Sequence, residues 1–126
     1  MSPAEDALLL LRLVERHLRS LRGTLDLATL ADEDWGFLAQ QTVEKLLKAL
    51  LVLHGQEPPR SHSLQRLLQE LAACGDTPAV APLLLDLEDF AVLARHDAEP
   101  TPLPGERLRL LELLEELHVD VRERLN

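Results

Sequence analysis

Apolar residues recur at three- and four-residue steps over the first part of the chain, with charged residues between them. This spacing is typical of an amphipathic helix, and the apolar stripe consists of Leu8, Leu11, Val14, Leu18 and Leu21. The opening Ser2-Pro3-Ala4-Glu5 is a capping-box pattern with proline at the first helical position. We therefore expect a helix that ends at Gly23 and carries arginine at positions 12, 16, 19 and 22 on its other side.

A longer helical pattern follows a connector of residues 24–31. It begins with the acidic run Asp32-Glu33-Asp34, where the helix dipole favours negative charge, and it continues to His54. At ~1.5 Å per residue this helix would be roughly 35 Å long. Gly55 ends it, and Pro58-Pro59 prevents its continuation. We expect this helix to be the spine of the domain.

Three further helical patterns cover residues 61–75, 77–95 and 106–124, with Pro82 delaying the regular part of the second. Short connections separate all the patterns, so neighbouring helices should pack antiparallel. We expect a single domain over residues 1–126 with an all-α fold, an antiparallel up-and-down bundle of about five helices.

The composition favours the same fold. The chain has 33 leucines, no isoleucine and no tyrosine, whereas strands prefer β-branched and aromatic residues. The single Cys74 excludes an internal disulfide, and we expect a buried structural thiol there.

The net charge of −9 is unevenly distributed. Residues 1–66 contain nine acidic and eight basic residues, whereas residues 67–126 contain thirteen acidic and five basic residues. This balance opposes generic nucleic-acid binding, which needs Lys and Arg against phosphates. An RNA ligand would have to approach the N-terminal half. The acidic half fits either a basic protein partner or a solvated helix face.

No apolar run approaches the ~20 residues of a membrane span. The run Ala7–Leu11 is also too short for a secretory signal and is followed at once by charged residues. We expect a soluble cytoplasmic protein without membrane association.

The long second helix carries a band of polar residues among its leucines. We refer to the following five residues as the polar band: Gln40, Gln41, Glu44, Lys45 and Lys48. Two interpretations remain open. The band is either a solvated face with an ordinary Glu44–Lys48 ion pair at i,i+4, or it faces a groove with Arg60 and His62 and forms an RNA-facing, partner-facing or dimer surface.

The segments that carry this band resemble the signature of HEPN domains, a family named for nucleotide binding in higher eukaryotes and prokaryotes. The matching segments are QQTVEKLLKAL at 40–50, Gly55 at the helix end, and RSHSL at 60–64. The family pattern is roughly A-Q-Q-A-x-E-K-x-L-K-A-L-L, a glycine, and an R-T-H-D-L-like element. The later LARH at 93–96 stands where many members have A-R-Y-P, so the resemblance covers most of the chain.

The resemblance implies a module that homodimerises and associates with a minimal nucleotidyltransferase encoded nearby. Such two-gene arrangements are described as toxin–antitoxin pairs, with the HEPN protein as the toxin. It also implies Arg95, together with the polar band, as candidate binding residues. Four consecutive leucines, Leu8–Leu11, cannot all face one core, so we expect the first helix to contribute to a dimer seam.

Many HEPN proteins resemble metal-independent RNases and carry an arginine, four to six intervening residues and a histidine. Arg95 has no histidine at that distance. Arg12 and His17 have the spacing, but five steps along a helix turn ~500° and would place the two side chains about 140° apart. The remaining catalytic candidates are Arg60 and His62. The sequence therefore favours a non-catalytic module, and a metal-independent endoribonuclease or RNA-binding protein is the alternative.

The sequence offers no support for a cofactor or a metal ion. No pair of histidines stands with acidic residues at metal-ligand spacing, and no glycine-rich phosphate loop is present. We expect His54 to interact with the helix dipole, and His96 and His118 to lie on the surface.

Overall fold

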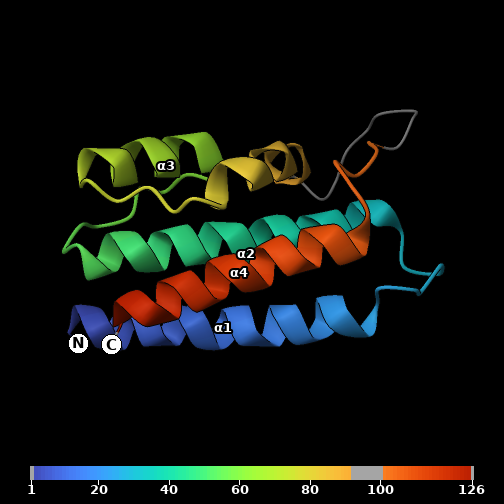
Figure 1. Cartoon of the computed structure of the whole chain (residues 1–126), viewed down its shortest axis with the longest axis horizontal. Helices are drawn as coiled ribbons and strands as arrows, with labels where there is room; N and C mark the ends of the chain where they lie inside the picture. Colours follow the sequence, from blue (N-terminus) through green and yellow to red (C-terminus); the bar gives the residue numbers. More distant parts are fainter. Residues whose placement is uncertain (1, 92–100, 126) are drawn as a thin grey trace.

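A computed structural model describes residues 2–91 and 101–125, and these residues form an all-α fold without strands (Figure 1). The all-α prediction is confirmed. The helices, in chain order, are α1 (Pro3–Gly23), α2 (Asp32–Leu53), α3 (Leu64–Ala73), the 3₁₀ helix η1 (Ala81–Phe90) and α4 (Arg107–Leu125).

Helix α2 is the centre of the arrangement. It contacts α1, α3, η1 and α4, and twelve of its 22 residues are buried. The long helices α1, α2 and α4 extend along the long axis of the molecule, while α3 and η1 follow one another along α2 (Figure 1). The prediction that the second helix is the spine of the domain agrees with this arrangement.

Helix α1 forms for the reasons that its sequence indicates. The Ser2 hydroxyl accepts a hydrogen bond from the Glu5 N–H at 3.2 Å, which satisfies one of the free amides at the helix start. The buried stripe is Ala7, Leu11, Val14, Leu18 and Leu21. Leu8 was expected in this stripe but is 41% exposed, and Leu9 is 44% exposed.

The fourth predicted helix differs from the expectation. Its described part is a 3₁₀ helix with proline in the first turn. The buried residues are Ala81, Leu84, Leu87 and Phe90, every third position. A helix with three residues per turn places such residues on one line, whereas an α-helix would spread them around its axis. The predicted extension to Arg95 lies outside the described residues.

Arg107, at the start of α4, fixes the connector between α1 and α2. Its guanidinium donates hydrogen bonds to the Thr24 carbonyl at 2.7 Å, the Leu30 carbonyl at 2.6 Å and the Asp32 carboxylate at 2.8 Å. It also lies 5.8 Å from the centre of the Trp35 ring, within cation–π range. The connector carbonyls therefore find partners although no regular helix continues there.

Cys74 caps the end of α3 as a free thiol and is only partly buried. The expectation of a buried thiol was wrong because the residue lies at the helix terminus, where α3 meets the turn at Gly75. The left-handed backbone of Gly75, with φ of 76°, makes that turn possible.

Gly36 is required by the close approach of α2 to η1. A Cβ atom at this position would lie 2.6 Å from Cδ1 of the buried Phe90 ring. We predict that Gly36→Ala destabilises the protein by about 1–2 kcal/mol, because overpacking outweighs the gain in helix propensity. The free energy of unfolding in urea measures the effect. Gly23→Ala is the matched control, since nothing lies within 4 Å of its added Cβ. Equal behaviour of the two variants would contradict the prediction.

Candidate functional site

The polar band on α2 is largely internal. Gln40 is fully buried and Glu44 is 4% exposed, and Gln41, Lys45 and Lys48 are partly buried. The interpretation as a solvated face was therefore wrong for the two residues at its centre, although the expected Lys48–Glu44 ion pair is present at 3.2 Å. Helical periodicity alone could not distinguish a solvated band from a buried one. The centre of the band is covered by the loop before α3, and the position of a loop does not follow from a helical repeat.

A single hydrogen-bonded network joins the whole band to His62. The His62 Nδ1 atom lies 2.8 Å from Glu44 Oε1. The Gln40 amide donates to Glu44 Oε1 at 3.3 Å and to the His62 carbonyl at 3.2 Å. Gln41 donates to Gln40 at 2.8 Å, and Lys45 donates to Gln41 at 3.2 Å. The network ties the loop before α3 to the middle of α2.

The protonation of Glu44 decides the direction of these bonds. Burial raises the pKa of Glu44, but the His62 hydrogen bond, the Lys48 charge and the Lys48 and Gln40 hydrogen bonds together lower it below its ordinary value. Glu44 is therefore ionised at neutral pH and can only accept hydrogen bonds, so His62 carries its proton on Nδ1. The His62 side chain is 69% exposed.

The other side of the band reaches α1. Burial lowers the pKa of Lys45, with Glu44 raising it and Lys48 lowering it further. The pKa of His17 on α1 is lowered by burial and by the charges of Lys45 and Arg16. The His17 Nε2 atom is buried without a hydrogen-bond partner among the described residues. His17 is therefore kept neutral beside the ammonium group of Lys45.

The structure does not bring Arg60 into this network. Arg60 is exposed and, in the described part of the chain, forms no hydrogen bond or ion pair with another side chain. Of the two catalytic candidates, only His62 contacts the polar band. The candidate binding residue Arg95 and the expected surface residue His96 lie outside the described residues.

A second polar cluster, which the sequence analysis missed, joins the C-terminal ends of α2 and α4. His54 Nε2 lies 2.8 Å from Asp76 Oδ2, and Arg124 donates to Asp76 at 2.8 Å and also pairs with Asp120. Burial raises the pKa of Asp76, but hydrogen bonds from His54 and Arg124 outweigh this effect and lower it. Asp76 lies 22 positions from His54 and 48 positions from Arg124, and no sequence pattern indicates pairs at such separations.

His118 was expected on the surface but is only 9% exposed. It stands on the face of α4 that packs against α1, among the buried leucines of that helix. Burial lowers its pKa, an effect that Glu15 and Glu115 oppose and Arg122 reinforces. The expectation failed because a histidine in a leucine-rich helix can occupy a core position without disturbing the apolar period.

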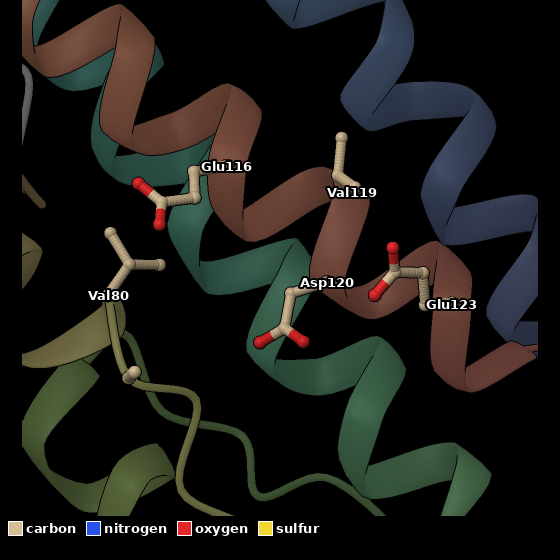
Figure 2. Close-up of a pocket in the computed structure, with 6 residues that line it drawn as sticks. Val80, Glu116, Val119, Asp120 and Glu123 are labelled. Carbon is tan, nitrogen blue, oxygen red and sulfur yellow. The ribbon is translucent and has the colours of Figure 1, made fainter.

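A hollow with three acidic residues lies between α4 and the segment that leads into η1. Val80 and Ala79 line one side, and Glu116, Val119, Asp120 and Glu123 of α4 line the other (Figure 2). Within the described ranges, no group of three His, Cys, Asp or Glu residues has the geometry to hold a metal ion. The hollow is acidic surface on the C-terminal half of the chain.

The family model of the HEPN domain matches residues 10–124, nearly the whole chain. The chain therefore belongs to the HEPN family. No curated protein and no solved structure matches it. None of the described helices has the length and apolar character to cross a membrane.

Because the pKa of Glu44 is lowered, the contribution of this residue to the free energy of unfolding should depend on pH. We expect Glu44→Gln to lower the free energy of unfolding by about 2 kcal/mol at neutral pH, since His62 and Lys48 lose a charged partner. The pKa of Glu44 is lower in the folded state than its ordinary value of 4.5, which applies to the unfolded chain. The ionised carboxylate therefore stabilises the fold at pH values above 4.5. This contribution is lost as the pH falls through the lower pKa of the folded state. The difference between wild type and variant should therefore shrink in acid.

Urea denaturation at several pH values down to about pH 3 measures this difference. Glu70→Gln is a suitable control, because Glu70 is more exposed and has a single, longer contact with Arg66 at 3.7 Å. A difference between wild type and Glu44→Gln that stays constant with pH would contradict the assignment.

Proposed function

We propose that this HEPN protein is a non-catalytic interaction module, which homodimerises and associates with a nucleotidyltransferase partner in a toxin–antitoxin-type pair. The observation that carries the proposal is the set of leucines exposed on α1. Leu8, Leu9 and Leu13 are 41%, 44% and 37% exposed, although the helix already buries a full apolar stripe. Leu9 and Leu13 are four residues apart and therefore share one exposed face of α1. Neighbouring apolar side chains on an exposed helix face are typical of a protein interface.

The surface charge supports a protein partner more than a nucleic acid. The chain carries a net charge of −9, and α4 presents Glu116, Asp120 and Glu123 around one hollow. A surface of this kind repels phosphates and attracts basic protein surfaces. We infer a nucleotidyltransferase as the class of partner because the chain belongs to the HEPN family.

The geometry around His62 argues against the RNase chemistry of the family. That chemistry needs an arginine to stabilise the charge of the phosphorane beside a histidine that moves a proton. Here the immediate partners of His62 are Glu44 and Gln40. Among the described residues, the guanidinium of Arg60 has no hydrogen bond or ion pair that would hold it beside the ring.

One observation favours the alternative, a metal-independent RNase or RNA-binding protein that uses Arg60 and His62. The Glu44 carboxylate orients the His62 ring through Nδ1 at 2.8 Å, while the side chain remains 69% exposed. A carboxylate that orients a histidine in this way is a common arrangement for a general base.

Self-association is expected to depend on the exposed leucines of α1. We predict that the wild type is a dimer in size-exclusion chromatography with light scattering at micromolar concentration, and that Leu9→Glu/Leu13→Glu is a monomer, because two charges would be desolvated in the seam. Leu27→Glu is the control, since Leu27 is 46% exposed but lies outside α1. A monodisperse wild-type monomer would refute the dimer.

Incubation with total cellular RNA in EDTA distinguishes the two candidate functions. We expect no cleavage by the wild type or by Arg60→Ala/His62→Ala, because no arginine among the described residues has a contact that would hold it beside His62. Gel electrophoresis of the RNA provides the readout. Cleavage by the wild type that the double variant loses would establish the RNase instead.

A further inference from the structure

A polar groove runs between α1 and α4, away from the polar band. It has a volume of about 480 Å³. Both helices contribute charged side chains to it, and its lining consists of Glu15, Leu18, Arg19, Arg22, Glu115, His118, Val119 and Arg122. Four of these eight residues are arginine or histidine, on a chain whose net charge is −9.

Two of the three arginines in the groove form no ion pair with an acidic residue in the described part of the chain. Arg22 pairs with Glu115 across the groove. Arg19 and Arg122, in contrast, are exposed and form no ion pair with the residues that the structure describes. A neighbouring hollow lined by Arg16, Arg19 and Ser20 extends the basic surface along α1. The groove therefore offers two free guanidinium groups from two different helices.

His118 forms part of the groove wall and has an unsatisfied ring nitrogen. The residue is 9% exposed, and its Nε2 atom is buried without a hydrogen-bond partner among the described residues. Glu15 Oε1 lies 3.8 Å from Nε2, beyond hydrogen-bond reach. Buried polar atoms without partners are rare in folded proteins, and His118 lines the same groove as Arg19 and Arg122.

We propose that the groove between α1 and α4 is a binding site for a doubly charged tetrahedral oxyanion, phosphate or a phosphate monoester, held by Arg19, Arg122 and His118. The guanidinium fork matches the geometry of phosphate oxygens and donates charge-assisted hydrogen bonds to them. With the half-exposed Glu15 side chain turned outward, an oxyanion in the groove accepts the hydrogen bond that His118 Nε2 lacks. This site is independent of self-association and of His62.

Titration with inorganic phosphate and with phenyl phosphate, at constant ionic strength set by sodium chloride, tests the site. The ¹⁵N shifts of the His118 ring report binding by NMR in the full chain. We expect a saturable shift in the wild type. Arg19→Gln and Arg122→Gln should each weaken binding about tenfold, the effect of one lost charge-assisted hydrogen bond. Glu15→Gln should tighten binding, because it removes the repelling carboxylate.

Arg12→Gln and Arg109→Gln are the matched controls, since these exposed arginines stand on the same two helices but do not line the groove. Binding in both controls should equal that of the wild type. Tighter binding of phenyl phosphate identifies a monoester as the ligand, and saturation by inorganic phosphate alone identifies the free ion. No saturable shift, an equal loss in the controls, or no tightening in Glu15→Gln would overturn the proposal.

Discussion

The burial of α2 determines how the other described helices pack. Each of the other described helices packs against it, so its residues face α1, α3, η1 or α4 in nearly every direction. Small and apolar residues satisfy most of these contacts, and Gly36 admits the Phe90 ring at a distance that no other residue would allow. The polar band must be explained within this crowded environment, because Gln40 and Glu44 are as buried as the leucines around them.

A buried carboxylate is costly unless its hydrogen bonds are satisfied. Glu44 meets this requirement with His62, Gln40 and Lys48, and the same contacts secure the loop from which α3 begins. The polar band and His62, which belong to the segments that resemble the family, therefore form an internal network that fixes the position of a loop. A surface role for the band rests on its partly buried members and on the exposed ring of His62.

Much of the fold could be predicted from the sequence, because α1, α2 and α4 have strong helical periods and clear end signals. Periodicity could not predict η1, whose buried residues recur every third position under the influence of a proline in its first turn. The pairing of Asp76 with His54 and Arg124 depends on which helix ends meet in space. The burial of His118 depends likewise on the contact of α4 with α1. Neither contact can be predicted from the spacing of apolar residues within one helix.

The polar band is an internal network that is coupled to the loop before α3 through Glu44 and His62. A double-mutant cycle with Glu44→Gln and His62→Ala, measured as free energies of unfolding at neutral pH, tests it most directly. We expect the two costs not to be additive, with a coupling energy of about 1 kcal/mol or more. Additive costs would mean that His62 lies beside Glu44 without coupling to it, and that the network does not secure the loop.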